Sequence, residues 1–386
     1  MKRLLLYLLA FAPLAAFADL PPTGFYRVQN VTTGSYMTIF DNRTSSTSSD
    51  IATSGHADLE AIHMLDGFEE NIAFNPATIC YIEAYGAGKY NISGQGLDLH
   101  NMTGRLFSIK EVSSSYQIYA KEESSAVSVT KYLTHPTNRY GKEPYPGIDG
   151  SNKNWNILSV DQSSSQYFGI KPEVSAAGYH WATMYAGFPF MASSSDMKIY
   201  VVKQIDYEKG CAVIEEVTNV SAQTPVLFRC SSATPSDNKL TLLAPGSEGS
   251  KGTTHLVGNY YCNDVNDVGA LYPHRNVIAY DENTMRMLGV DADGKPAFVK
   301  GSADNLVVSV VDGKLYLPAN KAYLKVDSSA PDVLKIMTEE EYITGIEQIT
   351  ASTTDGTKVI YDLQGRRVQA PSKGLYIVNG KKMIIK

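Results

Sequence analysis

Short runs in which apolar and polar residues alternate recur along most of the chain, separated by glycine, serine and asparagine. Alternation with a period of two is typical of β-strands that bury one face. Helical spacing appears only in residues 54–65. There, Leu59, Ile62 and Leu65 would share one face of a helix. The pattern predicts an all-β protein with one helical insertion, followed by a short turn over 74–79.

Three segments share one order of residues: an aromatic-x-aliphatic strand, a turn of small residues, and a tyrosine beside an apolar residue or a histidine. These segments begin at Tyr26, Tyr116 and Phe168. Repetition of a strand-rich unit at intervals indicates an architecture built from similar parts. We therefore expect a β-trefoil-like domain over 19–203, with the helical insertion in its first unit.

The string that opens the first unit, GFYRVQNVTTGSYMTI, resembles the start of a ricin-type lectin repeat. The resemblance implies a β-trefoil that binds sugar. Ricin-type repeats carry Gln-x-Trp near the closing strand, whereas this chain has Lys153-Asn154-Trp155 at the matching place. The sugar-binding residues of that family therefore do not transfer by motif.

The pattern changes after residue 203. Short strands at close spacing predict an antiparallel β-sandwich-like domain over 204–344. The string at 221–227 recurs in similar form at 318–324, and each predicts a turn that leads into an apolar strand. These stretches resemble domains that are common in Bacteroidetes surface proteins, and the resemblance implies no particular activity.

Residues 345–386 have a strand-and-turn pattern of their own. It includes Asn379-Gly380, which favours a two-residue hairpin turn. The strings YDLQGRRV at 361–368 and KGLYIV at 373–378 resemble the C-terminal sorting domains of secreted Bacteroidetes proteins. The resemblance implies recognition by an export machinery. The alternative is a plain β-hairpin at the end of the chain.

The first 18 residues have the pattern of a cleaved signal peptide. Lys2 and Arg3 precede an apolar run, and Ala16-Phe17-Ala18 is an A-x-A cleavage site. A membrane-spanning helix needs about 20 apolar residues, which neither this run nor any later one supplies. We expect a mature chain that begins at Asp19, has no transmembrane segment, and is secreted or held at the outer cell surface.

Composition narrows the class of protein further. The 386 residues are 43% hydrophobic and 19% charged, which excludes a disordered chain and a coiled coil. The formal net charge of −6 argues against a general nucleic-acid binder, because such proteins carry an excess of basic residues.

Cysteine and metal chemistry are limited. An exported chain permits disulfides. A hairpin of strands 211–216 and 225–230 would set Cys211 opposite Cys230, within bridging distance. Two buried free thiols are the alternative. No Cys/His spacing suits zinc, and Asp293-Gly294 is better explained as a hairpin turn than as calcium ligands, so no metal or cofactor is expected.

An aromatic-rich stretch over 178–190 is the candidate binding site. Sugar sites combine aromatic faces with nearby polar groups. The candidate ligand-binding residues are Trp155, Tyr179, His180, Trp181 and Tyr185. Alternation sends Tyr179 and Trp181 to one face of a strand and His180 to the other, so one of the two sets must serve the core.

Enzyme signatures such as G-x-S-x-G and H-E-x-x-H do not occur in the sequence. We expect a secreted or cell-surface protein that is not an enzyme and that binds a glycan. One alternative is a structural or protein-interaction component without sugar binding. A second alternative is a glycoside hydrolase whose two carboxylates leave no local signature.

Overall fold

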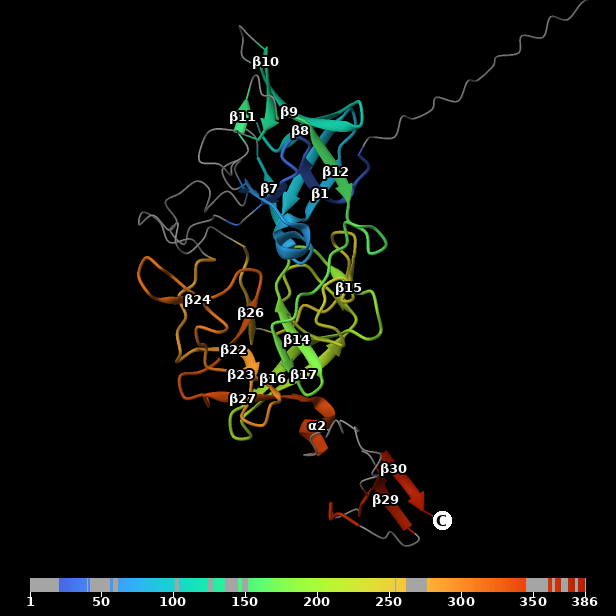
Figure 1. Cartoon of the computed structure of the whole chain (residues 1–386), viewed down its shortest axis with the longest axis vertical. Coiled ribbons are helices and arrows are strands. Elements are labelled where there is room, and N and C mark those ends of the chain that lie inside the picture. The colour runs from blue at the N-terminus through green and yellow to red at the C-terminus, as the bar shows by residue number, and fades with distance from the viewer. Residues whose placement is uncertain are drawn as a thin grey trace, which may run out of the picture.

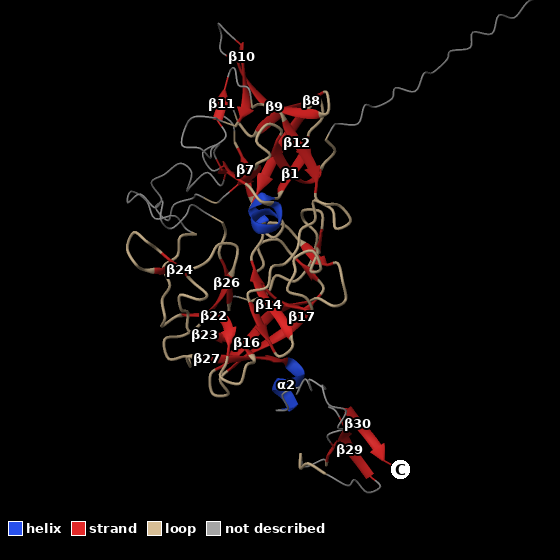
Figure 2. Cartoon of the chain, in the orientation of Figure 1, coloured by secondary structure: helices blue, strands red, loops and turns tan. Residues whose placement is uncertain are grey.

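The structure is a computed structural model, and it describes residues 21–39, 41, 56–57, 62–100, 104–123, 128–135, 145–147, 152–253, 255–261, 276–344, 360–362, 365–368, 374–378 and 381–385. The predicted signal peptide over 1–18 lies outside the described residues, as do 345–359 and Cys262. The structure is 48% strand and 5% helical, which confirms the prediction of an all-β protein (Figure 1, Figure 2).

Residues 24–159 form one sheet, which we call the ring domain. Its strands are β1 (Gly24–Asn30), β2 (Tyr36–Ile39), β3 (His56–Ala57), β4 (Ile62–Leu65), β5 (Cys80–Ala84), β6 (Lys89–Gly94), β7 (Leu97–Leu99), β8 (Leu106–Val112), β9 (Ser115–Glu123), β10 (Ser128–Thr134), β11 (Tyr145–Gly147) and β12 (Trp155–Ser159).

Six strands of the ring domain pair in a closed circuit. β1 pairs with β5, β5 with β6, β6 with β8, β8 with β9, β9 with β12, and β12 with β1, always antiparallel. The other strands add the pairs β2–β4, β3–β7 and β10–β11. Closure leaves the six strands without a free edge, which removes a site for uncontrolled strand addition.

The core of the ring domain is built by the alternation seen in the sequence. Val28 on β1, Ile118 on β9 and Trp155 on β12 are each fully buried in one apolar cluster. The indole nitrogen of Trp155 donates a hydrogen bond to the Leu133 carbonyl at 3.0 Å. Trp155 is therefore a core residue, and its burial gives no support to the ligand-binding role expected for it.

The helix predicted over 54–65 is not found at its C-terminal end. Residues 62–65 are strand β4, which pairs antiparallel with β2. Ile62 and Met64 are buried and the residues after each are half-buried, so a period of two prevails over the helical spacing. The helical turns follow instead: a π-helix at Phe68–Ile72 and a 3-10 helix at Pro76–Thr78, which confirms the short turn predicted over 74–79.

Residues 168–344 form a second unit, which we call the sheet domain, built around a ten-stranded sheet. The ten strands are β13 (Val174–Ala176), β14 (Tyr179–Met184), β16 (Lys198–Asp206), β17 (Cys211–Val217), β19 (Val226–Cys230), β21 (Leu256–Gly258), β22 (Met285–Val290), β23 (Pro296–Val299), β26 (Ala322–Lys325) and β27 (Val333–Thr338). Smaller elements are β15 (Phe190–Ala192), β18 (Asn219–Val220), β20 (Leu240–Leu242), β24 (Val307–Val308), β25 (Leu315–Tyr316) and the helix α2 (Glu339–Thr344).

The ten-stranded sheet contains the same strand arrangement twice. One half has the order β14-β19-β16-β17 and the other β21-β26-β22-β23, with β27 between β17 and β23. In each half a hairpin is followed by a strand that returns to pair with the first strand of that hairpin. The recurrent strings at 221–227 and 318–324 lead into the matching strands β19 and β26, as predicted.

The expected domain boundary after residue 203 does not separate two sheets. β16 runs through it, and β13 and β14 on its N-terminal side belong to the ten-stranded sheet. The ring domain is completed by 115–159, so the segment that begins at Phe168 is not its third unit. Strands of both domains show the same two-residue alternation of apolar and polar side chains. The sequence pattern therefore does not specify which sheet a strand joins.

The predicted disulfide has no structural basis. β17 and β19 do not pair with each other, because both pair with β16, on its two sides. Cys211 lies opposite Asp206 at one end of β16, and Cys230 lies beyond Arg229, which is opposite Lys198 at the other end. At about 3.3 Å per residue these ends are roughly 25–30 Å apart, too far for a bridge. Cys80, Cys211 and Cys230 are free and buried.

The two domains meet at a tight backbone contact. A Cβ atom added to Gly187 would lie 2.6 Å from the Gln95 Cα and 2.5 Å from the Gly96 nitrogen. Asn320 of the sheet domain donates a hydrogen bond from Nδ2 to Asn75 Oδ1 of the ring domain at 2.8 Å. Figure 1 shows the domains stacked along the long axis of the molecule.

The C-terminal segment forms a small antiparallel sheet of β28 (Ile360–Tyr361), β29 (Gly374–Val378) and β30 (Lys381–Ile385). Val378 pairs with Lys381. The turn predicted at Asn379-Gly380 lies outside the described residues. The strands predicted for this segment are therefore present.

Candidate functional site

The structure disperses the predicted ligand-binding residues. Trp155 lies in the core of the ring domain, whereas the other four belong to β14 of the sheet domain or follow it. Trp181 has only 5% of its surface exposed and packs in an apolar cluster to which both halves of the ten-stranded sheet contribute. Its indole nitrogen donates to the Ala176 carbonyl at 3.3 Å, and its ring stacks on Tyr200. Neither tryptophan presents a face to solvent.

The polar members of the set have local partners. Tyr179 lies under the guanidinium of Arg229, whose central carbon is 4.6 Å from the ring centroid. The Nδ1 atom of His180 is 2.8 Å from Ser175 Oγ. Tyr179 and Trp181 pack on one face of β14, in the same cluster, as the alternation predicted. Two half-buried groups on opposite faces of one strand do not make a shared site.

Tyr185 serves as packing between strands. Its ring centroid is 4.4 Å from that of Tyr260. A Cβ atom added to Gly258 would lie 2.1 Å from the Tyr185 ring, so the glycine makes room for the tyrosine. The contact gives the aromatic residue that follows β14 a packing role.

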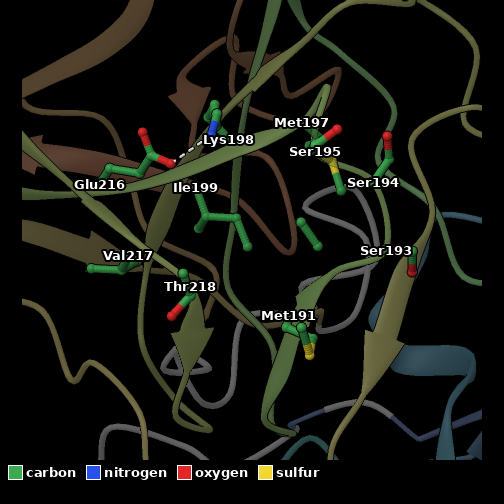
Figure 3. Close-up of a pocket in the computed structure, with 11 residues that line it drawn as sticks. Met191, Ser193, Ser194, Ser195, Met197, Lys198, Ile199, Glu216, Val217 and Thr218 are labelled. Atoms are coloured by element: carbon green, nitrogen blue, oxygen red, sulfur yellow. Dashed lines mark hydrogen bonds and ion pairs between the residues drawn. The ribbon is translucent and has the colours of Figure 1, made fainter.

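A groove of about 230 Å³ lies between the end of β15 and the start of β16 (Figure 3). Its polar lining includes the Ser193–Ser195 turn and an ion pair between Lys198 Nζ and Glu216 Oε1 at 2.8 Å. No aromatic residue lines it. Ser193 Oγ is 2.9 Å from Thr241 Oγ1, and the lysine and glutamate neutralise each other, so little free binding capacity remains.

The outer surface of the ring domain carries a different group of residues, which we call the tyrosine–lysine face: Lys110 of β8, Tyr119 of β9, Tyr132 of β10, and Lys153 just before β12. Tyr119 and Tyr132 are opposite each other in the β9–β10 register, with ring centroids 5.6 Å apart. The neighbouring residues Ile118 and Leu133 point into the core, so strand alternation turns both tyrosines outward.

Both lysines of this face lie over aromatic rings. Lys153 Nζ is 4.7 Å from the centroid of Tyr132. Lys110 Nζ is 5.6 Å from the centroid of Tyr132 and 5.7 Å from that of Tyr119. A cation over a ring face is held by attraction to the negative potential of the π-system. The two ammonium groups are therefore positioned side by side around one pair of tyrosines.

Hydrogen bonds fix the frame of this face. Gln117 Nε2 donates to Asn154 Oδ1 at 2.9 Å, which ties the residue after Lys153 to β9. Sequence reasoning missed these residues because Tyr119 and Tyr132 lie on different strands, β9 and β10, apart in the chain but directly opposite in the register. Only the strand register brings them together. In the sequence, the tyrosine-x-aliphatic pattern at 116–118 indicated a repeat and did not indicate a binding surface.

The described part of the chain shows neither a metal-binding group nor a membrane-spanning helix. Among those residues no group of three or more His, Cys, Asp or Glu side chains is arranged to hold a metal ion. No helix there has the length and apolar character needed to cross a bilayer.

Comparison with known proteins adds no assignment. No protein-family model matches the chain, and no curated protein is similar enough to it to count as a relative.

Proposed function

We propose that this chain is an exported, non-catalytic protein that binds glycans through the tyrosine–lysine face of its ring domain. The observation that carries the proposal is the cross-strand pair of Tyr119 and Tyr132, flanked by Lys110 and Lys153. Aromatic rings with adjacent donors are the groups that contact both the C–H surface and the hydroxyls of a sugar ring.

The proposed architecture agrees with this role. We interpret the closed circuit of six strands with its three additional pairs as a β-trefoil, with units at 24–84, 89–112 and 115–159. The units differ from those expected from the sequence, but their number is the same. We interpret the sheet domain as sandwich-like, because β15, β18 and β20 cover one face of the larger sheet through a shared apolar cluster.

Export is part of the proposal. Its support is the basic and apolar start of the chain with Ala16-Phe17-Ala18, and the C-terminal segment over 345–386. Deletion of 345–386 is expected to leave the two larger domains folded and to stop delivery to the surface. Cell fractionation beside circular dichroism measures both, and normal surface delivery of the truncated chain would remove the tail from the proposal.

A glycan array with chain 19–386 tests the binding function. Tyr119→Ala is expected to weaken any glycan bound by at least about tenfold, which is about 1.4 kcal/mol. Tyr85→Ala is the matched control, because Tyr85 is a 48% exposed tyrosine of the same domain that also lies beside a cation, Arg105. Equal losses in both variants, or binding by neither the parent nor the variants, would contradict the proposed site.

A protein-interaction role is the second candidate function. The observation that favours it is the β24–β25 hairpin, on which Val310 is 85% exposed and Val311 is 70% exposed, beside Val307 and Val308. Clustered exposed apolar side chains are uncommon on a monomeric protein surface. Sedimentation of the parent and of Val310→Ser with Val311→Ser distinguishes the cases, since self-association through this hairpin would disappear in the double variant.

A further inference from the structure

Three lysines converge on the tyrosine–lysine face and its continuation across the sheet. Lys89 of β6, Ser108 of β8, Tyr119 of β9 and Tyr132 of β10 follow one another in register. Lys89 Nζ donates a hydrogen bond to Ser108 Oγ at 2.9 Å, so it lies on the same outer surface as the tyrosines. Adjacent strands are about 4.8 Å apart, which makes this row roughly 14 Å long.

The lysines of this surface have no acidic partners among the described side chains. Lys110 and Lys153 contact tyrosine rings, and Lys89 contacts a serine hydroxyl. In the sheet domain both arrangements occur. Five lysines there have a carboxylate oxygen within 3.6 Å, namely Lys198, Lys203, Lys300, Lys314 and Lys321. Lys171, Lys209 and Lys239 each lie over an aromatic ring instead.

The lack of acidic partners on this surface is informative because the protein as a whole is acidic, with 40 Asp and Glu against 34 Lys and Arg. Carboxylates are therefore plentiful, yet none neutralises these ammonium groups within the described chain. Tyrosine faces hold the ammonium groups near the surface without cancelling their charge. The surface retains a local excess of positive charge with aromatic area beside it.

We infer that the tyrosine–lysine face selects an anionic saccharide, one that carries sulfate or carboxylate groups. The inference rests on the proposed glycan-binding function and specifies its ligand class. Sulfate esters and uronic acids present the same chemistry to a lysine, namely oxygens that accept charge-assisted hydrogen bonds from an ammonium group. Lys110 and Lys153 bind the anionic group, and the exposed side of Tyr119 contacts the sugar ring.

The inference is tested with chain 19–386 and three immobilised polysaccharides: one sulfated, one built from uronic acid without sulfate, and one neutral. We expect the anionic polymers to bind at least tenfold more tightly than the neutral polymer. We expect that preference to shrink several-fold between about 0.05 and about 0.5 M NaCl, because salt screens exposed charges. The two anionic arms identify whether sulfate or carboxylate is the preferred group.

Variants separate charge from packing. Lys110→Met with Lys153→Met is expected to abolish the preference for anionic polymers and to leave weak neutral binding. Lys153→Arg should keep the preference. Lys171→Met is the matched control, since Lys171 Nζ also lies over a ring, 4.5 Å from the centroid of Phe74, but in another part of the molecule.

The outcomes distinguish this inference from the function on which it rests. If the neutral polymer binds as tightly as the anionic polymers, and salt does not weaken that binding, the anionic ligand class is overturned and glycan binding stands. Binding to none of the polymers and to no glycan on the array overturns both. A preference that survives the double lysine variant places the anion site elsewhere and overturns the assignment to this face.

Discussion

Gln223 and Asn320 occupy matching places in the two halves of the sheet domain, and each has a backbone φ of 60°. Gln223 ends the turn that leads into β19, and Asn320 ends the turn that leads into β26. The Gln223 nitrogen donates to the Ala186 carbonyl, and the Asn320 carbonyl accepts from the Tyr185 nitrogen, so both turns attach to the same short segment after β14. The two halves therefore converge on one pair of consecutive residues.

The positive φ at Gln223 makes it sensitive to side-chain branching. A β-branched residue is strained in the left-handed region, whereas glycine is not. Gln223→Val is expected to lower the free energy of unfolding by about 1–2 kcal/mol, and Gln223→Gly to change it much less. Urea unfolding of the two variants measures the difference, and equal losses would show that side-chain contacts govern this turn instead of its backbone conformation.

Trp181 is predicted to support stability and not ligand binding. Trp181→Ala removes a buried ring and is expected to cost about 3–5 kcal/mol in unfolding free energy. The fraction that remains folded should bind glycans as the parent does, because the tyrosine–lysine face lies in the other domain. A variant that unfolds like the parent but loses glycan binding would restore the interpretation of Trp181 as a ligand contact.

The buried cysteines are predicted to be unreactive while the protein is folded. Burial raises the pKa of Cys80 and of Cys230 to about 12, so almost no thiolate exists at pH 8. In a Cys262→Ser background, a thiol reagent at pH 8 should label the native protein at least about tenfold more slowly than the protein in denaturant. Rapid labelling of the native protein would contradict this burial.

The same pKa shifts set a direction for alkaline stability. The folded chain keeps these thiols protonated, whereas the unfolded chain loses the protons near their ordinary pKa of 9.0. Their contribution to stability is complete below pH 9 and is lost as the pH rises toward 12. The urea midpoint of Cys80→Ala should therefore fall less steeply above pH 9 than that of the parent, and parallel curves would show that Cys80 does not contribute.

Gly187 is predicted to couple the two domains. A methyl group there would meet the backbone of Gln95 and Gly96 at 2.5–2.6 Å, which no side-chain rotation relieves. Gly187→Ala should separate the thermal unfolding of the ring and sheet domains into two transitions and increase the radius of gyration measured by solution scattering. A single unchanged transition would show that the contact adapts without loss.

The sequence was sufficient for much of the local structure, but it predicted a helix where residues 62–65 are a strand, and it was insufficient for the assignment of strands to sheets. Alternation identified the strands near Tyr26, Tyr116 and Trp155 correctly, because burial of one face imposes a period of two whatever the partner strand. The predicted hairpin between 211–216 and 225–230 failed because β16, which comes earlier in the chain, lies between the two strands. Such long-range pairing leaves no local signature.

The candidate site shows the same limit. Trp181 was a candidate because of its aromatic side chain. Residue type does not reveal burial, and Trp181 is buried in the core. Tyr119 and Tyr132 were unremarkable in the sequence, and they form a surface only through their register. Lys110 and Lys153 became candidates only because the same register places the tyrosine rings beside them. Considered alone, each is an ordinary solvent-exposed lysine.

Strand β27 determines the order in which this protein can be assembled. β27 pairs in parallel with β17 and antiparallel with β23, and it lies between the two halves of the sheet. It is also the last strand of that sheet along the chain, so a growing polypeptide presents two unpaired edges until residues 333–338 emerge. Unpaired edges recruit other strands. The interval before β27 arrives is thus the period of greatest risk of aggregation, and a chaperone that shields sheet edges would act then.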